Sequence, residues 1–284
     1  MEAYISAIIQ GLCFSSLALG IFISMRVLNL PDITTDGSFT LGAAVTAVML
    51  AQQIPVYFIL PAVCICGAIA GSITGIIHTV LRVHVLLAGI IVMTALYSVN
   101  LIVMGRTNIP FDEGFFMSNI FGDSNIWITM TIYVAVLVVI INRLLLSDFG
   151  IVLRALGSNS TMLTANGVNT KALTIKGLAI SNALTALSGS MIAQHQQFAD
   201  LNMGIGIVII GLGSVIIGES LFSFFKSQVL FLKLVAVVFG ALVFRVLIAF
   251  VLSQDVNPNY LRLITATVVL AVVALSYKKN PAID

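Results

Sequence analysis

Apolar runs of membrane-spanning length follow one another along almost the whole chain, separated by short polar connections. A helix that crosses a bilayer needs about 20 predominantly apolar residues. Runs of this kind lie at about Tyr4–Met25, Pro55–Ile77, Val85–Gly105, Ile126–Leu145, Ala172–Ala193, Gln228–Leu252 and Tyr260–Tyr277. The pattern predicts an all-α, polytopic membrane helical bundle of about 8–10 transmembrane helices, counting two shorter spans, in a single domain over residues 1–284.

Two further apolar runs are too short to cross a membrane by themselves. Phe39–Ala51 follows a polar stretch that contains Pro31, Asp32 and Asp36, and the run Gly204–Gly218 is short and rich in glycine. At about 1.5 Å per residue, the first run covers about 20 Å of a hydrocarbon core that is roughly 30 Å thick. Short spans broken by Gly or Pro in corresponding halves of a chain are typical of a transport site. We therefore expect the translocation pathway at these two breaks.

The two halves of the chain share a weak repeat at a constant offset. Gly11 and Leu12 correspond to Gly177 and Leu178, Ser15 corresponds to Ser181, and Asp36 corresponds to Asn202. Because the first run of each half is expected to enter the membrane from opposite sides, the sequence predicts an inverted repeat.

The distribution of lysine and arginine predicts the orientation of the chain. Basic connections carry Arg26, Arg82, Arg143 to Lys176, Lys226 and Lys278–Lys279, whereas the intervening connections at Gln52–Gln53, 112–123, Asp200 and Asp255 hold only Arg106. Connections rich in lysine and arginine stay in the cytoplasm. We therefore expect the amino terminus outside and the carboxyl terminus in the cytoplasm.

Composition supports a membrane protein and excludes several other classes. Of the 284 residues, 60% are hydrophobic and 8% are charged, whereas soluble domains contain about 25% charged residues. The net charge of +2 is too small to indicate nucleic acid binding. Cys13, Cys64 and Cys66 lie inside apolar runs, as small core residues do. The chain has no phosphate-binding loop for ATP and no catalytic motif, so we expect no enzyme, no bound cofactor and no metal.

The longest connection that has the pattern of ordered structure is residues 148–171, DFGIVLRALGSNSTMLTANGVNTK. It predicts a compact helix over Ile151 to Leu156, a turn at Gly157, Ser158 and Asn159, and a second short helix near Ser160. Its basic residues place it in the cytoplasm. An ordered polar segment of this length indicates a docking site for another protein, although a plain linker between two halves of the bundle has the same pattern.

The run FGIVLRALGSN, followed by TANGV, resembles the cytoplasmic coupling segment of ABC importer permeases of the branched-chain amino acid and ribose type. The resemblance extends over nearly the whole chain and is closest to the small permeases of tryptophan/tyrosine-type importers. The matching positions are Gly150, Arg154, Ala155, Leu156, Gly157, Asn159, Ala165, Gly167 and Val168.

The resemblance implies a set of partners. In that family the segment sits in a cleft of a separate ATPase subunit, so the ATP is used by the partner subunits. It implies a bacterial inner-membrane protein that forms a homodimeric pore with a second copy, two cytoplasmic ABC ATPase subunits and an extracytoplasmic substrate-binding protein. The implied solute is an amino acid, aromatic or branched-chain; the family also carries sugars and nucleosides.

The resemblance also covers both breaks in the apolar pattern. LNLPDITTDGSFTLGAA is similar to the kinked block before the second helix of the family, and GIVIIGLGSVIIGESLF is similar to its Gly-rich pore helix, although the double Gly usual before the Ser is absent. The candidate pathway residues are Thr35, Asp36, Ser38 and Phe39 in the first break, and Asn202, Gly206, Gly211, Gly213 and Ser214 in the second.

The polar groups inside the spans allow two interpretations each. A carboxylate at bilayer depth costs at least about 2.5 kcal/mol, so Asp32 and Asp36 either line a polar pathway or accept backbone N–H groups at the start of the next helix, a capping role open to Asp36 and Ser38. Arg245 either reaches the interface or a buried partner, or takes part in substrate binding. His195 either lines an outer vestibule that faces a binding protein or lies in a loop at the membrane interface.

Two other functions fit the same chain. An ion-driven secondary transporter is compatible with the inverted repeat and with Asp36, and it would work without any ATPase. A membrane scaffold has no need for spans broken by polar residues, which argues against it.

Overall fold

A computed structural model describes residues 2–111, 126–222, 229–253 and 260–279. Its helices are α1 (Glu2–Ile21), the π-helical turn η1 (Phe22–Val27), α2 (Thr34–Ala51), the 3-10 turn η2 (Val56–Phe58), α3 (Ile59–Val80), α4 (Val85–Met104), α6 (Ile126–Leu146), α7 (Asp148–Ser158), α8 (Ser160–Ala165), α9 (Thr170–Gln196), α10 (Ile207–Phe222), α11 (Leu230–Leu252) and α12 (Leu261–Lys279). Two short antiparallel strands, β1 (Asn108–Pro110) and β2 (Phe198–Asp200), complete it.

The architecture confirms the predicted all-α membrane bundle. Among the described residues, the segments long and apolar enough to cross a membrane are Tyr4–Val27, Ile59–Val80, Val85–Met104, Ile126–Leu146 and Leu230–Val251. Many large apolar side chains on α3, α4 and α6 are exposed on the outside of the bundle. A surface of this kind suits lipid rather than water. The connection at 112–123, Lys226 and Asp255 lie outside the described residues.

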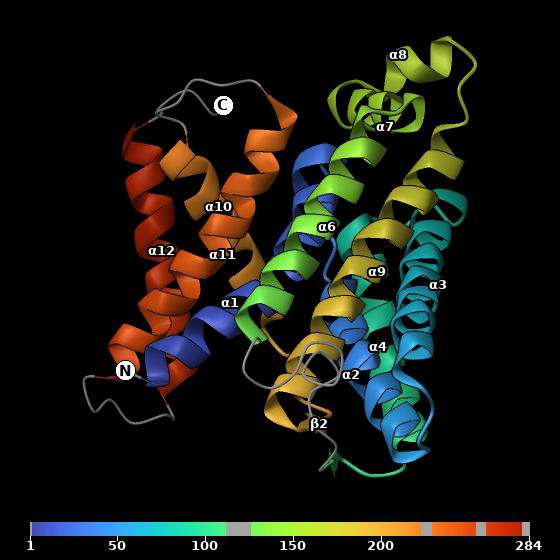
Figure 1. The fold of residues 1–284 in the computed structure, drawn as a ribbon. Helices are drawn as coiled ribbons and strands as arrows, with labels where there is room; N and C mark the ends of the chain where they lie inside the picture. Colours follow the sequence, from blue (N-terminus) through green and yellow to red (C-terminus); the bar gives the residue numbers. More distant parts are fainter. Residues whose placement is uncertain (1, 112–125, 223–228, 254–259, 280–284) are drawn as a thin grey trace.

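The helices run between two ends of the bundle. Helices α7 and α8 stand at one end, and the start of α1 and the β1–β2 pair lie at the opposite end (Figure 1). The last turn of α12 lies at the same end as α7 and α8 (Figure 1). The first and last described segments therefore begin and end on opposite sides, as the distribution of basic residues predicts.

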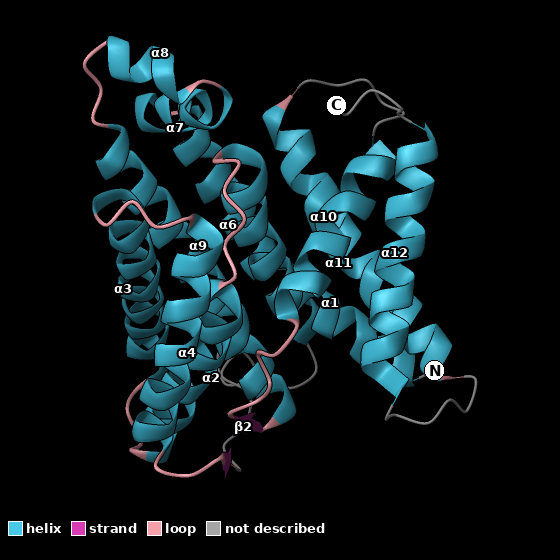
Figure 2. Cartoon of the chain, turned by 180° about the vertical axis from the view of Figure 1, so that it is seen from behind, coloured by secondary structure: helices cyan, strands magenta, loops and turns pink. Residues whose placement is uncertain are grey.

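The two halves have the inverted arrangement that the weak repeat predicts. After α1 the chain turns back into the bundle as the extended segment 28–33 and continues as α2. After α9 the chain turns back from the other end through β2 and residues 201–206 and continues as α10. Figure 2 shows the segment before α2 and the segment before α10 as loops that approach each other from opposite ends. Each break therefore places the start of a helix inside the bundle.

Helix α9 is the central packing element, in contact with α1, α2 and α3. Small residues let these backbones approach closely: a Cβ on Gly42 would lie 1.9 Å from the Ala186 carbonyl oxygen, and one on Gly71 would lie 2.2 Å from the Leu178 oxygen. Hydroxyl groups join the same helices, since Thr46 Oγ1 donates to Ser190 Oγ at 2.7 Å. Small residues and interhelical hydroxyl bonds are the usual means of helix association in lipid.

Gly42→Leu should destabilise the bundle, because the new side chain has no space against the backbone of α9. Overpacking of this kind typically costs about 1–3 kcal/mol. We expect a lower melting temperature for the detergent-solubilised protein. Ala95→Leu, on the exposed part of α4, is the matched control and should leave the melting temperature unchanged. Equal melting temperatures for the two variants would contradict the close packing of α2 and α9.

Candidate functional site

The first buried carboxylate belongs to Asp32, in the extended segment before α2. Its Oδ1 accepts the backbone N–H of Thr34 at 2.9 Å, and its Oδ2 accepts the side-chain amide of Asn182 at 2.7 Å. The side chain is fully buried. Asp32 therefore caps the start of α2 and joins it to α9, and the negative charge lies at the positive end of the helix dipole.

The second buried carboxylate belongs to Asp36, in the first turn of α2. Its Oδ2 accepts the backbone N–H of Gly206 at 2.9 Å, and its Oδ1 accepts that of Val208 at 3.0 Å. Gly206 has a φ of 83°, a conformation that glycine adopts without strain. The carboxylate in the first broken span thus caps α10, the helix of the second broken span. This contact joins the two halves of the protein.

Capping was one of the two interpretations of these polar groups. The structure shows capping, but the capped helices differ from those that the sequence indicated. Asp36 and Ser38 were expected to cap the helix that follows them, α2, but Asp32 performs that role. Asp36 caps α10, and Ser38 donates its hydroxyl to Asn182 Oδ1 at 2.6 Å. The helix begins at Thr34 rather than at the apolar run, since Asp32 provides its cap. Capping follows from sequence pattern only when the cap and the helix are neighbours in the chain.

Asn182 of α9 completes the site, although the sequence pattern predicts for it only a hydrogen bond between helices. Its Oδ1 accepts from Ser38, and its Nδ2 donates to Asp32 Oδ2 and to the Leu178 carbonyl oxygen at 3.0 Å. A single amide therefore binds two polar residues of the first break, Asp32 and Ser38. The available signal was an asparagine in an apolar helix, which indicates an interhelical hydrogen bond without identifying its partner.

The remaining candidate pathway residues separate into two groups. Thr35 and Phe39 are buried beside Asp36 in α2, and Asn202 is exposed just before the turn that leads into α10. The others pack between helices: a Cβ on Gly211 would meet Ile21 Cδ1 at 2.1 Å, one on Gly213 would meet Val269 Cγ2 at 2.8 Å, and Ser214 donates to the Ile210 carbonyl oxygen. The structure brings Thr35, Asp36, Ser38, Phe39 and Gly206 together at the junction of the two broken spans.

The predicted coupling segment forms a short helical hairpin at one end of the bundle. Ser147 Oγ accepts the Gly150 N–H at 3.4 Å at the start of α7, and Asn159 Oδ1 accepts the Met162 N–H at 2.9 Å at the start of α8. A Cβ on Gly157 would lie 2.0 Å from the Val27 carbonyl oxygen, so α7 rests directly on the end of η1. The hairpin is an ordered part of the bundle.

The coupling residues divide into inward and outward positions. Gly150 and Leu156 are buried, and Ala155 and Gly157 are partly buried. Arg154, Asn159, Ala165 and Gly167 are exposed. Two large apolar side chains, Ile151 and Met162, are also exposed, at 50% and 51%. The hairpin therefore presents a basic, polar and apolar surface outward and is anchored by small and apolar residues inward.

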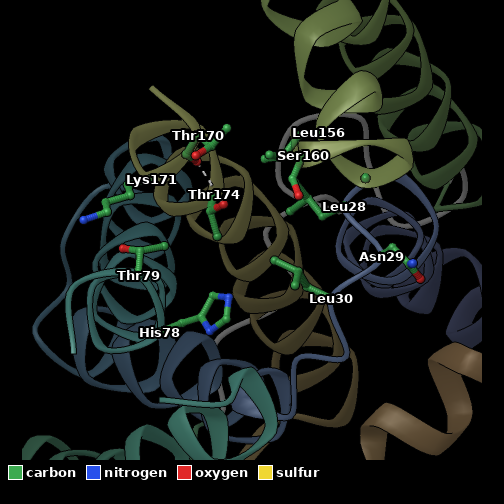
Figure 3. A pocket seen from close by; sticks show the side chains of 11 residues that line it. Leu28, Asn29, Leu30, His78, Thr79, Leu156, Ser160, Thr170, Lys171 and Thr174 are labelled. Atoms are coloured by element: carbon green, nitrogen blue, oxygen red, sulfur yellow. Dashed lines mark hydrogen bonds between the residues drawn. The ribbon is translucent and has the colours of Figure 1, made fainter. Parts of the chain in front are cut away.

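A cavity of about 360 Å³ separates part of the hairpin from the bundle. Leu156 and Ser160 line it on the side of α7 and α8, and His78 lines it on the side of α3 (Figure 3). Thr170 and Thr174 of α9 are joined by a hydrogen bond from the Thr174 hydroxyl at 3.0 Å, and the Lys171 side chain points away from the space (Figure 3). The hairpin is thus held by α6, α9 and η1, with open space toward α3.

Arg245 lies between α11 and α1, with its guanidinium carbon 3.7 Å from the centre of the Phe14 ring. Among the described residues, its cation has no carboxylate within ion-pair distance. Phe14 stacks on Phe39, with 5.8 Å between ring centres. The predicted buried partner is therefore an aromatic ring, and a cation over a ring is stabilised by the ring quadrupole. The alternative role in substrate binding stays a prediction.

Two other polar residues have partners that the sequence did not indicate. Glu219 near the end of α10 forms an ion pair with Arg26 of η1. His195 approaches the Ser6 hydroxyl through Nε2 at 3.4 Å, near the β1–β2 end of the bundle. In the part of the chain that the structure describes, no three His, Cys, Asp or Glu residues are grouped so as to hold a metal ion.

The comparisons with known proteins agree with this geometry. Residues 3–273 match the family described as branched-chain amino acid transport system / permease component. The chain is 38% identical to the tyrosine transport system permease protein of Clostridioides difficile, over 99% of this chain and 96% of that protein. It is 24% identical to the ribose import permease protein RbsC of Haemophilus influenzae, over 87% of this chain and 76% of that protein.

A further relative is an uncharacterised protein of Rickettsia prowazekii, 35% identical over 94% of this chain and 95% of that protein. No solved structure matches the chain. The family match covers both broken spans and the α7–α8 hairpin. This multi-pass membrane protein therefore belongs to the branched-chain amino acid transport permease family and is the permease component of a transport system for small solutes.

Proposed function

We propose that the chain is the permease subunit of a bacterial inner-membrane ABC importer for an amino acid. Two copies form the translocation pathway, two ATPase subunits bind the α7–α8 hairpins, and an external binding protein delivers the solute. The observation that carries the proposal is the hairpin, which is capped, anchored at Gly157 and exposed at Arg154. Since the chain has no ATP-binding loop, the energy for pumping comes from the partner.

The orientation follows from the hairpin. An ATPase works in the cytoplasm, so the α7–α8 end faces inward and the β1–β2 end faces outward. The amino terminus is then outside and the last turn of α12 is in the cytoplasm (Figure 1). Arg26, Arg82, Arg143 and Arg154 all lie at the α7–α8 end, which agrees with the rule for positively charged loops.

The geometry provides a route for the energy. ATP-driven closure of the ATPases moves the two hairpins toward each other. Movement of α7 acts on Val27, because the two backbones are in direct contact. The chain from Val27 leads through the extended segment to Asp32 and Asp36, which hold the starts of α2 and α10. Rocking of the broken spans around these caps would open the pathway alternately to each side.

The solute class rests on the relatives. The permease that is 38% identical is named for tyrosine, and the one that is 24% identical is named for ribose. An amino acid, aromatic or branched-chain, is therefore our first choice. A sugar or a nucleoside is the alternative, and uptake of labelled tyrosine, leucine and ribose by the reconstituted complex separates them.

Charge reversal at the exposed arginine of the hairpin tests the proposal. Arg154→Glu should reduce uptake by the reconstituted complex about tenfold, because a basic contact with the ATPase becomes a repulsive one. Lys176→Glu, a charge reversal on an exposed residue of α9 beyond the segment 148–171, is the control and should have a smaller effect. Both variants should insert and fold normally, since both side chains are exposed.

The same assay decides between pumping and ion-driven transport. Under the proposal, wild-type permease without ATPase subunits carries no solute against its gradient. The buried carboxylate of Asp36 is the feature that favours a secondary transporter, because intramembrane acids often bind coupling ions. Uptake driven by a proton or sodium gradient in the absence of ATPase, and unaffected by Arg154→Glu, would replace the first proposal with the second.

A further inference from the structure

A second cavity, of about 210 Å³, lies directly beside Asp36. Helix α2 provides Asp36 and Thr40, α4 provides Tyr97 and Asn100, and the turns at residues 201–206 before α10 provide Ile205. Asn100 lies one turn before the end of α4, so the cavity is in the half of the bundle away from α7 and α8. The side chains of Tyr97 and Ile205 are exposed, at 48% and 49%, and form its open rim.

Asp36 and Thr40 offer this cavity hydrogen-bond acceptors. The Thr40 hydroxyl donates its proton to the Asp36 carbonyl oxygen at 3.2 Å, which leaves only its lone pairs for a ligand. Each Asp36 carboxylate oxygen already accepts one backbone N–H from the start of α10. A carboxylate has about four lone-pair sites, and the start of α10, with Ile207 as a third backbone donor, does not occupy all of them. Since Asp36 neutralises the positive end of α10, the cavity does not offer that helix end to an anion.

Asn100 adds an acceptor that has no partner. Its Nδ2 donates to the Gly37 carbonyl oxygen at 3.2 Å, which fixes the orientation of the amide. Its Oδ1 is buried without a hydrogen-bond partner among the described residues, and only 1% of the residue is exposed. A buried polar atom without a partner costs about 1–3 kcal/mol. The protein therefore keeps an unsatisfied acceptor beside an open cavity.

We propose that this cavity binds the ammonium group of a small zwitterionic solute during translocation, with the apolar side chain of the solute against Tyr97 and Ile205. The inference rests on the proposed transport of an amino acid and adds that the permease itself recognises the solute. Binding of the ammonium at Asp36 and Thr40 draws the Asn100 amide oxygen into the same site. The carboxylate of the solute points to the open rim, where water solvates it.

The size and lining of the cavity agree with such a ligand. Its volume lies below the range of about 300–1,000 Å³ that is usual for drug-sized ligands. A single amino acid, with its side chain reaching the open rim, therefore fits, and a larger ligand does not. Its walls are mainly apolar with a few convergent polar groups, the usual composition of a small-molecule site. A sugar, which presents hydroxyl groups on all sides, would leave most of them facing apolar atoms.

Protection of a cysteine at the rim tests the site without any transport. Ile205→Cys places a thiol at the opening of the cavity, and its rate of reaction with a maleimide is measured on the full transporter complex in nanodiscs. The probes are L-tyrosine, tyramine, which lacks the carboxylate, and 3-(4-hydroxyphenyl)propionate, which lacks the ammonium group. We expect L-tyrosine and tyramine to slow the reaction and the propionate to leave it unchanged.

Two variants in the Ile205→Cys background examine the acceptors. Thr40→Val and Asn100→Leu should each raise the half-protecting tyramine concentration about tenfold, the effect of losing one hydrogen bond to a charged group. Thr131→Val on α6 is the control, because Thr131 makes the same kind of bond to a carbonyl in its own helix and lies away from the cavity. Asn100→Asp keeps the acceptor and should restore protection where Asn100→Leu loses it.

The outcomes separate this inference from the proposed function. Protection by the propionate equal to that by tyramine, or protection by neither amine, would overturn the ammonium site even if the complex imports amino acids. Protection by both amines that Thr40→Val and Asn100→Leu leave unchanged would overturn it too. Amine-specific protection in a complex that shows no ATP-driven uptake would support the site and refute the proposed function.

Discussion

Asp36→Ala should lower ATP-driven uptake by the reconstituted transporter at least 100-fold. The substitution leaves the Gly206 and Val208 N–H groups at the start of α10 without their acceptor. Each hydrogen bond to a charged group contributes about 1.5–3 kcal/mol, so losing both costs about 3–6 kcal/mol. A loss of that size detaches α10 from α2, and the two broken spans no longer move together.

Asp36→Asn distinguishes the loss of the hydrogen bonds that cap α10 from the loss of the negative charge. An asparagine keeps one acceptor oxygen and places an N–H₂ group opposite the other backbone N–H, so uptake should fall less than for alanine. Asp200→Ala is the control: Asp200 Oδ1 also accepts a backbone N–H, from Asn202 at 2.8 Å, but in the connection between α9 and α10. If Asp36→Ala and Asp200→Ala reduced uptake equally, the bond between the halves would not be needed for transport.

Gly157→Val should uncouple ATP hydrolysis from uptake, with at least a tenfold fall in solute carried per ATP. A Cβ at this position would lie 2.0 Å from the Val27 carbonyl oxygen, so α7 must lift away from η1. The exposed residues of the hairpin remain available to the ATPase, and hydrolysis by the assembled complex should continue. Uptake of labelled solute and release of phosphate, measured on the same vesicles, give the ratio directly.

Ser158→Val is the matched control, since it adds the same side chain at the next, exposed position. It should change the ratio much less than Gly157→Val. A parallel loss of hydrolysis and uptake in Gly157→Val would show instead that the hairpin no longer binds the ATPase. An unchanged ratio would show that the contact with Val27 does not transmit force.

Local patterns predicted much of the fold. Apolar runs of spanning length appear as α1, α3, α4, α6 and α11, because a buried or lipid-facing helix must be apolar along its whole length. The hairpin appears where expected, since Ser147 and Asn159 cap α7 and α8 from adjacent positions in the chain. The first broken span follows from Asp32 and Asp36, which interrupt the apolar pattern before Phe39, and the second follows from the short Gly-rich run Gly204–Gly218.

Contacts between distant segments were not predictable in the same way. The partner of Asp36 is the start of α10, and that of Glu219 is Arg26 at the other end of the sequence. Asn182 joins the site through the packing of α9 against α2, which no periodicity in the chain encodes. Hydrogen bonds of this kind depend on which helices lie together, and the sequence pattern gives only the helices.

Helix α10 is joined to the first half of the protein at both of its ends. Its start is held by the buried Asp36. Near its other end, Glu219 pairs with Arg26, and the side chain of Glu219 is 35% exposed and that of Arg26 is 47% exposed. Dissolved ions screen exposed charges and hardly reach buried ones. Raising the ionic strength therefore weakens the exposed Arg26–Glu219 ion pair and spares the buried contact at Asp36, so that concentrated salt leaves α10 free to pivot around a single fixed point.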